Sequence, residues 1–198
     1  MIIQIFLALF FWMFDGNSVK VISSSYLADK PKANDSKKIT WSSSRKLTWD
    51  DFQKEADAND PLHAMASTNI AVSATCRNNV MTYDVKCQFA QNESWTKNKV
   101  SVDLLQHEQL HFDITEVYAR QLRQKLSQQK SLCTGDKTKF KAVVNKVFAD
   151  WQKAQVRYDN ESNHGINDAK QAAWAETVAT QLDALSAYQL EENNTAGL

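Results

Sequence analysis

Two stretches in the middle of the chain alternate apolar and polar residues with a period of two. The apolar positions are Ile70, Val72, Ala74 and Cys76 in the first stretch and Met81, Tyr83, Val85, Cys87 and Phe89 in the second. This period is typical of half-buried strands. Asn78-Asn79 between them supplies a two-residue hairpin turn, because asparagine tolerates a positive φ.

The turn fixes the register of the hairpin. It pairs Cys76 with Met81 and Ile70 with Cys87, so that every apolar residue meets an apolar partner. Cys76 and Cys87 then stand about 20 Å apart along the ladder, whereas a disulfide needs Cα atoms within about 7 Å. We therefore expect no bond between these two cysteines. We predict instead a Cys87–Cys133 bridge to the loop after the next helix.

The apolar spacing becomes helical after residue 100 and predicts three helices. The first spans about residues 101–130, the second about 137–156, and the third begins at Asn167 or Asp168. The expected fold class is α+β, with a small antiparallel sheet packed on the first helix and two further helices after it.

The N-terminus differs from the rest of the chain. Residues 1–14 are apolar except for Gln4, which is too short a run to span a bilayer but suits a signal peptide. We interpret residues 1–18 as a signal peptide with cleavage after Ser18, or as a retained N-terminal anchor. Residues 19–38 read as a linker, 39–190 as the domain and 191–198 as a polar tail. The protein is then exported, to the periplasm or beyond, with no stable membrane span.

Charge and composition exclude some classes of function. The 23 basic and 23 acidic residues give a net charge of zero. No basic stripe marks a nucleic-acid interface. With 43% hydrophobic residues, the chain has enough apolar side chains for a packed core.

The chemistry of the chain is concentrated in His107-Glu108-Gln109-Leu110-His111, inside the first predicted helix. Histidines four residues apart lie on one helix face, one turn from each other, so both imidazoles reach one Zn²⁺ ion. Glu108 beside them is placed to act as the general base on a zinc-bound water. The pattern predicts a zinc-dependent hydrolase, with Glu108 as a catalytic residue and His107 and His111 as metal ligands.

A catalytic zinc site needs a third protein ligand. The metzincin pattern is excluded, because Ile114 and Val117 stand where its glycine and third histidine belong. The ligand is therefore expected in the polar connection at residues 158–165. His164 is the first choice, since imidazole is a good zinc ligand, and Glu161 is the alternative.

Two neighbours in the same connection have candidate roles. Tyr158 is a candidate catalytic donor to a developing oxyanion, or else a tyrosine at the edge of the core. Asp159 either orients a ligand imidazole or caps the turn.

Several motifs together resemble a bacterial family, domain of unknown function 922, whose members are interpreted as secreted zinc-dependent proteases of the zincin type. The matching pieces are Trp41-Ser42, Arg45 to Phe52, Ala66-Ser67-Thr68, Ser94-Trp95, Leu104 to Ile114, Tyr118-Ala119-Arg120, Tyr158-Asp159, Asn163-His164-Gly165, Gln171 and Trp174. The resemblance covers residues 39–185 and implies a zincin-like fold with a zinc site. The family usually has a small residue at Leu110 and threonine at Ser162, and neither departure removes a proposed ligand.

We therefore expect an exported zinc metallopeptidase that acts on a peptide or protein substrate. In zincin-like sites an edge strand lines the substrate groove, and the segment Val80–Phe89 is the candidate here. One alternative is a non-catalytic binding or scaffold protein with a structural or vestigial metal site. Another is an amidase that acts on cell-wall peptides.

Overall fold

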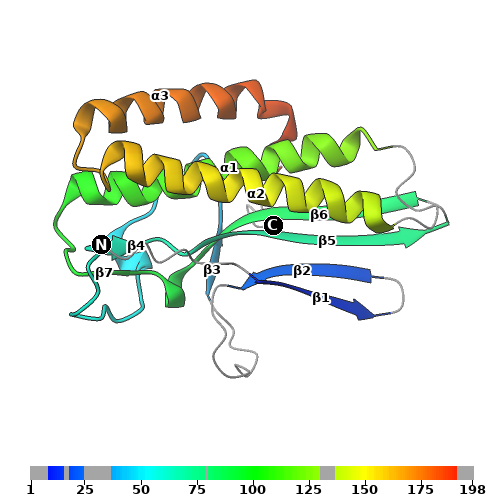
Figure 1. Ribbon diagram of the computed structural model, residues 1–198, viewed down its shortest axis with the longest axis horizontal. Coiled ribbons are helices and arrows are strands. Elements are labelled where there is room, and N and C mark those ends of the chain that lie inside the picture. The colour runs from blue at the N-terminus through cyan, green and yellow to red at the C-terminus, as the bar shows by residue number, and fades with distance from the viewer. Residues whose placement is uncertain (1–8, 16–17, 25–36, 79, 130–136, 191–198) are drawn as a thin grey trace, which may run out of the picture.

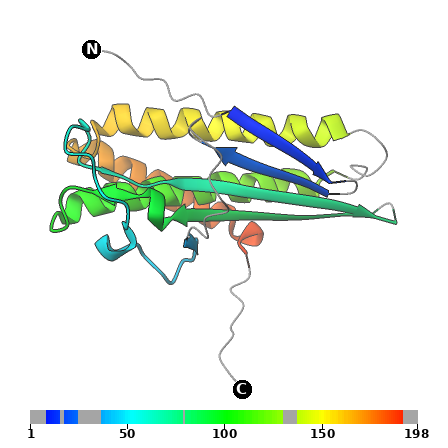
Figure 2. The ribbon, with the colours of Figure 1, turned by 90° about the horizontal axis from the view of Figure 1, so that it is seen from below.

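The computed structural model describes residues 9–15, 18–24, 37–78, 80–129 and 137–190. Within these residues an antiparallel five-stranded sheet carries three long helices on one side (Figures 1 and 2). The strand order is β1 (Leu9–Asp15), β2 (Ser18–Ser24), β5 (Thr68–Arg77), β6 (Val80–Ala90) and β3 (Lys38–Thr40), and β4 (Ala64–Met65) pairs with β7 (Trp95–Thr96) in a second small sheet. The predicted α+β class is confirmed.

The helices are α1 (Val102–Ser127), α2 (Lys137–Ser162) and α3 (Asp168–Ala184), with 3₁₀ turns at Trp49–Asp51, Gln91–Glu93 and Ser186–Tyr188. Ser101 caps α1 and Asn167 caps α3, each accepting a backbone N–H with its side chain. α1 packs on β5 and β6, while α2 and α3 pack on α1. No helix of the described segments is long and apolar enough to cross a membrane.

The hairpin of β5 and β6 has the predicted register. Cys76 pairs with Met81 and Ile70 with Cys87, and Asn78 in the turn has a φ of 50°. Asn79, the other predicted turn residue, lies outside the described residues. The alternation was sufficient because this register brings the buried side chains Ile70, Val72, Ala74, Val85, Cys87 and Phe89 to one face of the hairpin.

The predicted Cys87–Cys133 bridge is wrong, because Cys87 is a free, buried cysteine. Its Sγ lies 3.7 Å from the carbonyl oxygen of Phe112, so the thiol faces α1 from the middle of the sheet. Cys76, near the tip of the hairpin, is disulfide-bonded. The expected absence of a Cys76–Cys87 bond is confirmed, and Cys133 lies outside the described residues.

The structure differs from the sequence prediction at the N-terminus. β1 and β2 form a hairpin within the segments interpreted as signal peptide and linker, and β2 pairs with β5. Val19 stands opposite Ala74 and Val21 opposite Val72. This short alternation of valines is a strand pattern, which accounts for the pairing. The signal peptide itself stays a prediction, and residues 1–8, 25–36 and 191–198 lie outside the described part of the chain.

A buried ionic network fixes α1 between the sheet and the C-terminal segment. Glu116 accepts hydrogen bonds from Arg120 and Arg123, both at 2.9 Å, and all three side chains are almost fully buried. Arg123 also donates to the backbone oxygens of Val85 and Tyr188. The network satisfies the buried charges and links three separate parts of the fold.

Candidate metal centre

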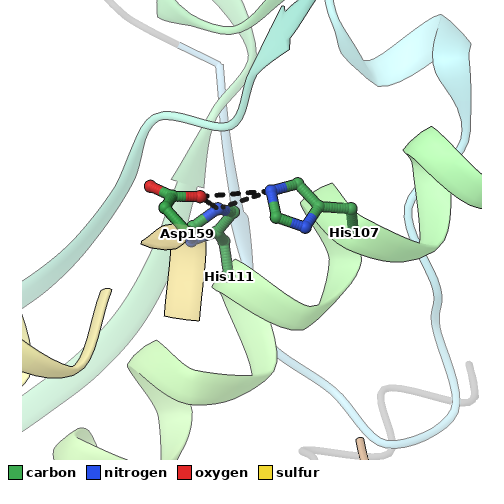
Figure 3. Close-up of side chains that lie close together, drawn as sticks. All are labelled: His107, His111 and Asp159. Carbon is green, nitrogen blue, oxygen red and sulfur yellow. Dashed lines mark hydrogen bonds and ion pairs between the residues drawn. The ribbon is translucent and has the colours of Figure 1, made fainter. Parts of the chain in front are cut away.

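Three side chains converge where α1 faces the C-terminal end of α2 (Figure 3). His107 and His111 come from α1 and Asp159 from α2. Asp159 Oδ1 lies 3.2 Å from His107 Nε2 and 2.9 Å from His111 Nε2. The candidate ligand atoms all lie within 4.8 Å of one another. Two imidazole nitrogens and one carboxylate oxygen form a donor set that suits Zn²⁺.

Asp159 reaches the histidines because α2 continues to Ser162, six residues beyond its predicted end. In a helix, Trp151, Gln155 and Asp159 lie on one face at intervals of four. The indole of Trp151 donates to Thr115 Oγ1 at 3.1 Å, and the Gln155 amide donates to the same oxygen at 2.9 Å. Asp159 is the next polar residue along this face, so these contacts set the position of its carboxylate.

Glu108 shares a cavity with the cluster. The cavity has a volume of about 980 Å³ and is lined by Glu108, both clustered histidines, Asp159 and the segment of residues 61–68. Glu108 Oε2 accepts a 2.7 Å hydrogen bond from the backbone N–H of Ala66, between β4 and β5. Burial raises the pKa of Glu108, while the positive charges of His111 and His107 oppose this rise.

The predicted substrate strand is wrong, because no residue of β6 lines the cavity. β6 lies inside the sheet between β5 and β3. The wall beside the histidines is formed instead by residues 61–68, which contain β4. Its residues lack the alternating apolar pattern on which the prediction was based.

His164 lies at the edge of the cluster and lines the cavity. Its Nδ1 is 3.5 Å from Asp159 Oδ1, and about half of its side chain is exposed. The turn after α2 presents it through three consecutive positive φ values, at Asn163, His164 and Gly165. The group of atoms close enough to share a metal ion consists of the other two histidines and Asp159. The role of His164 as a ligand stays a prediction.

The alternative ligand, Glu161, faces α3 rather than the cluster. Its Oε2 accepts a 2.9 Å hydrogen bond from the indole of Trp174, and its Oε1 lies 3.7 Å from Nε of Arg157. It is absent from the residues that line the cavity. The helical twist places it two positions beyond Asp159, on the opposite side of α2.

Tyr158 lies beneath the histidines rather than at the cavity. Its side chain is fully buried, and its ring stacks on His107 with centroids 4.7 Å apart. Its hydroxyl donates to Gln171 Oε1 at 2.6 Å. Because the hydroxyl already has a partner and does not line the cavity, we replace its predicted oxyanion role with packing against the imidazoles.

The cluster is strongly coupled electrostatically. Burial lowers the pKa of His111, but the hydrogen bond and charge of Asp159 outweigh it and raise this pKa to about 9. Burial raises the pKa of Asp159, but its hydrogen bonds from His107 and His111 hold that pKa well below its usual range. The carboxylate is therefore ionised and available as a metal ligand.

The sequence interpretation identified the two helical histidines and Glu108 but gave Asp159 only a supporting role. The missing signal was the interval of four from Trp151 through Gln155 to Asp159, which becomes visible once α2 is extended. His63 is exposed and also lines the cavity.

Comparison with known proteins yields a family but no described activity. No curated protein and no solved structure matches the chain. A family model described as "Bacterial protein of unknown function (DUF922)" matches residues 12–165, which include α1, α2 and the whole cluster. The chain therefore belongs to the bacterial DUF922 family, whose function is unknown.

Proposed function

We propose that this protein is an exported, zincin-like, zinc-dependent hydrolase that cleaves peptide bonds. The main observation that supports this proposal is that Glu108 lines the same cavity as His107, His111 and Asp159. The two imidazoles and the Asp159 carboxylate would hold the metal, with His164 beside them. A carboxylic acid that is not needed as a ligand but adjoins the ligands is suited to proton transfer.

When bound in such a site, zinc lowers the pKa of a coordinated water and polarises a substrate carbonyl. The protein contributes Glu108 as the base. Burial raises the pKa of Glu108 towards the range in which a carboxylate both accepts and returns a proton. The backbone N–H of Ala66 holds Oε2 at 2.7 Å, which fixes the carboxylate and leaves its other oxygen for the proposed proton transfer.

In this proposal Glu108 takes a proton from the attacking water and delivers it to the amine that leaves. The C–N bond of the amide breaks and a carboxyl group and an amine are formed, with one water consumed. The cavity of about 980 Å³ is large enough for several residues of a peptide. Its wall at residues 61–68 lies next to Glu108 and so next to the bond to be cleaved.

The test compares wild type with Glu108→Gln on a peptide library, at equal zinc occupancy. The substitution keeps the shape of the side chain and removes the base, so hydrolysis should fall by several orders of magnitude while zinc stays bound. Glu176→Gln, at an exposed position of α3, is the matched control and should cleave like wild type. Equal rates in wild type and Glu108→Gln, including zero in both across pH and metal, would favour a scaffold with a structural metal.

A further inference from the structure

Each clustered histidine has its second ring nitrogen opposite a glutamine from another helix. His111 Nδ1 lies 2.6 Å from Oε1 of Gln155 on α2. His107 Nδ1 lies 3.4 Å from Oε1 of Gln171 on α3. In both histidines, Nε2 is the nitrogen that points to Asp159.

The orientation of the Gln155 amide follows from its other contacts. Thr115 Oγ1 donates its only proton to the carbonyl oxygen of His111, at 2.8 Å. In its other hydrogen bonds Thr115 Oγ1 is therefore the acceptor. The Gln155 NH₂ group donates to Thr115 Oγ1 and to the same His111 carbonyl, at 2.9 and 3.0 Å. Its Oε1 therefore faces Nδ1 as an acceptor, and Nδ1 of His111 carries the proton.

Gln171 is oriented in a similar way by a buried tyrosine. The Tyr158 hydroxyl donates to Gln171 Oε1 at 2.6 Å, which makes this oxygen the acceptor side of the amide. His107 Nδ1 approaches the same oxygen as a second donor. Gln171 lies outside residues 12–165, the part of the chain that the family model matches.

We infer that Gln155 and Gln171 are positioning residues that hold both histidines as the Nδ1–H tautomer, with the Nε2 lone pairs directed at one metal ion. The hydrogen-bond partner of a metal-binding histidine fixes the tautomer and the ring orientation of that histidine. Loss of the partner typically weakens metal binding about 10- to 100-fold. Both partners here are neutral amides, so they orient the rings without adding negative charge to a site that already contains Asp159 and Glu108. The inference rests on the proposed metal site and assigns α3 a part in it.

The affinity test uses zinc alone, titrated against a chromogenic chelator near neutral pH. Gln155→Leu and Gln171→Leu should each bind zinc about 10- to 100-fold more weakly. Matched controls are Gln152→Leu on α2 and Gln181→Leu on α3, neither of which lines the cavity, and these should bind like wild type. Gln171→Glu retains the acceptor and should bind at least as tightly as wild type. Leucine variants that match the controls, or a Gln171→Glu variant that loses as much affinity as Gln171→Leu, would overturn the inference.

A second measurement needs no variant. In ¹⁵N-resolved spectra of the zinc-loaded wild type, His107 and His111 should carry their proton on Nδ1, and a proton on Nε2 of either would overturn the inference. If wild type binds no zinc, the proposed function fails. The metal-free protein then still reports the contact, because an Nδ1 proton of His111 hydrogen-bonded to Gln155 Oε1 supports the inference and an Nδ1 without a proton overturns it, so the two failures can be told apart.

Discussion

Asp159 Oδ1 lies 2.9 Å from Nε2 of His111, although the two residues belong to different helices. The same oxygen lies 3.2 Å from His107 Nε2 and 3.5 Å from His164 Nδ1. Three imidazoles therefore surround one carboxylate oxygen. The ring nitrogens of the two helical histidines are fixed by α1, whereas the His164 ring is half exposed on a turn. Asp159 is likewise held by a helix, α2. We therefore expect Asp159, rather than His164, to be the third ligand.

Asp159→Ala should lower zinc affinity by at least about 100-fold, because a negatively charged ligand of the metal is lost. His164→Ala should lower it by only about 10-fold, the lower end of the range for a residue that contacts a ligand, because its side chain is half exposed. Both affinities are measured by chelator competition, with melting curves to show that each variant is folded. A large loss in His164→Ala with little loss in Asp159→Ala would return the role of third ligand to His164.

The spatial arrangements that the sequence predicted correctly depend on short stretches of the chain. The hairpin register follows from alternation within one short stretch, and the pair His107 and His111 follows from the repeat of a single helix. The position of Asp159 depends on where α2 ends. The polar residues after Val156 show no apolar periodicity, so the sequence did not predict that the helix continues to Asp159. In the structure, Gln155 and Asp159 on the polar face of α2 contact Thr115 and His111. These contacts support the helix beyond the point where the apolar pattern stops.

Gly165 is required next to His107 for a steric reason. Its φ is +82°, and a Cβ added there would lie 3.0 Å from His107 Cβ and 3.2 Å from His107 Nδ1. Gly165→Ala should cost about 1–2 kcal/mol for the left-handed backbone and should also weaken zinc binding by displacing the imidazole. Asn163→Ala is the matched control, because it places alanine at a φ of 50° in the same turn. Denaturant melts should show a loss for both variants, whereas a zinc titration should show a loss for Gly165→Ala alone. Equal zinc affinities in the two variants would contradict a contact with His107.

The Cys87 thiol is expected to be unreactive in the folded protein. It is fully buried between the sheet and α1, and burial together with the charge of Glu116 raises its pKa well above the ordinary value. Little thiolate forms at neutral pH, and reagents cannot reach it. Iodoacetamide followed by peptide mapping should label Cys87 only after denaturation. Labelling of the native protein would show that the sheet and α1 separate readily.

The misassigned disulfide has a physical explanation. The sequence predicted that Cys87 would bond because the alternation placed it far from Cys76 in the hairpin, but the same alternation also directs it into the core. A buried cysteine in the centre of a sheet packs as a small apolar side chain, without a bonding partner. The strand pattern alone did not show that α1 covers this face of the sheet.

The last prediction concerns the buried network around Glu116. Glu116 is 2% exposed and accepts hydrogen bonds from Arg120 and Arg123, so Glu116→Gln leaves two buried guanidinium groups with a neutral partner. Removing one member of a buried ion pair typically costs about 3–5 kcal/mol, because the remaining charge stays desolvated without compensation. Urea denaturation should detect a loss of that size. Asp150→Asn is the control, since it breaks the exposed Lys146–Asp150 pair on α2 and should cost at most about 0.5 kcal/mol. A similar small loss in both variants would show that water reaches the two arginines, and that the network does not hold α1 between β6 and the C-terminal segment.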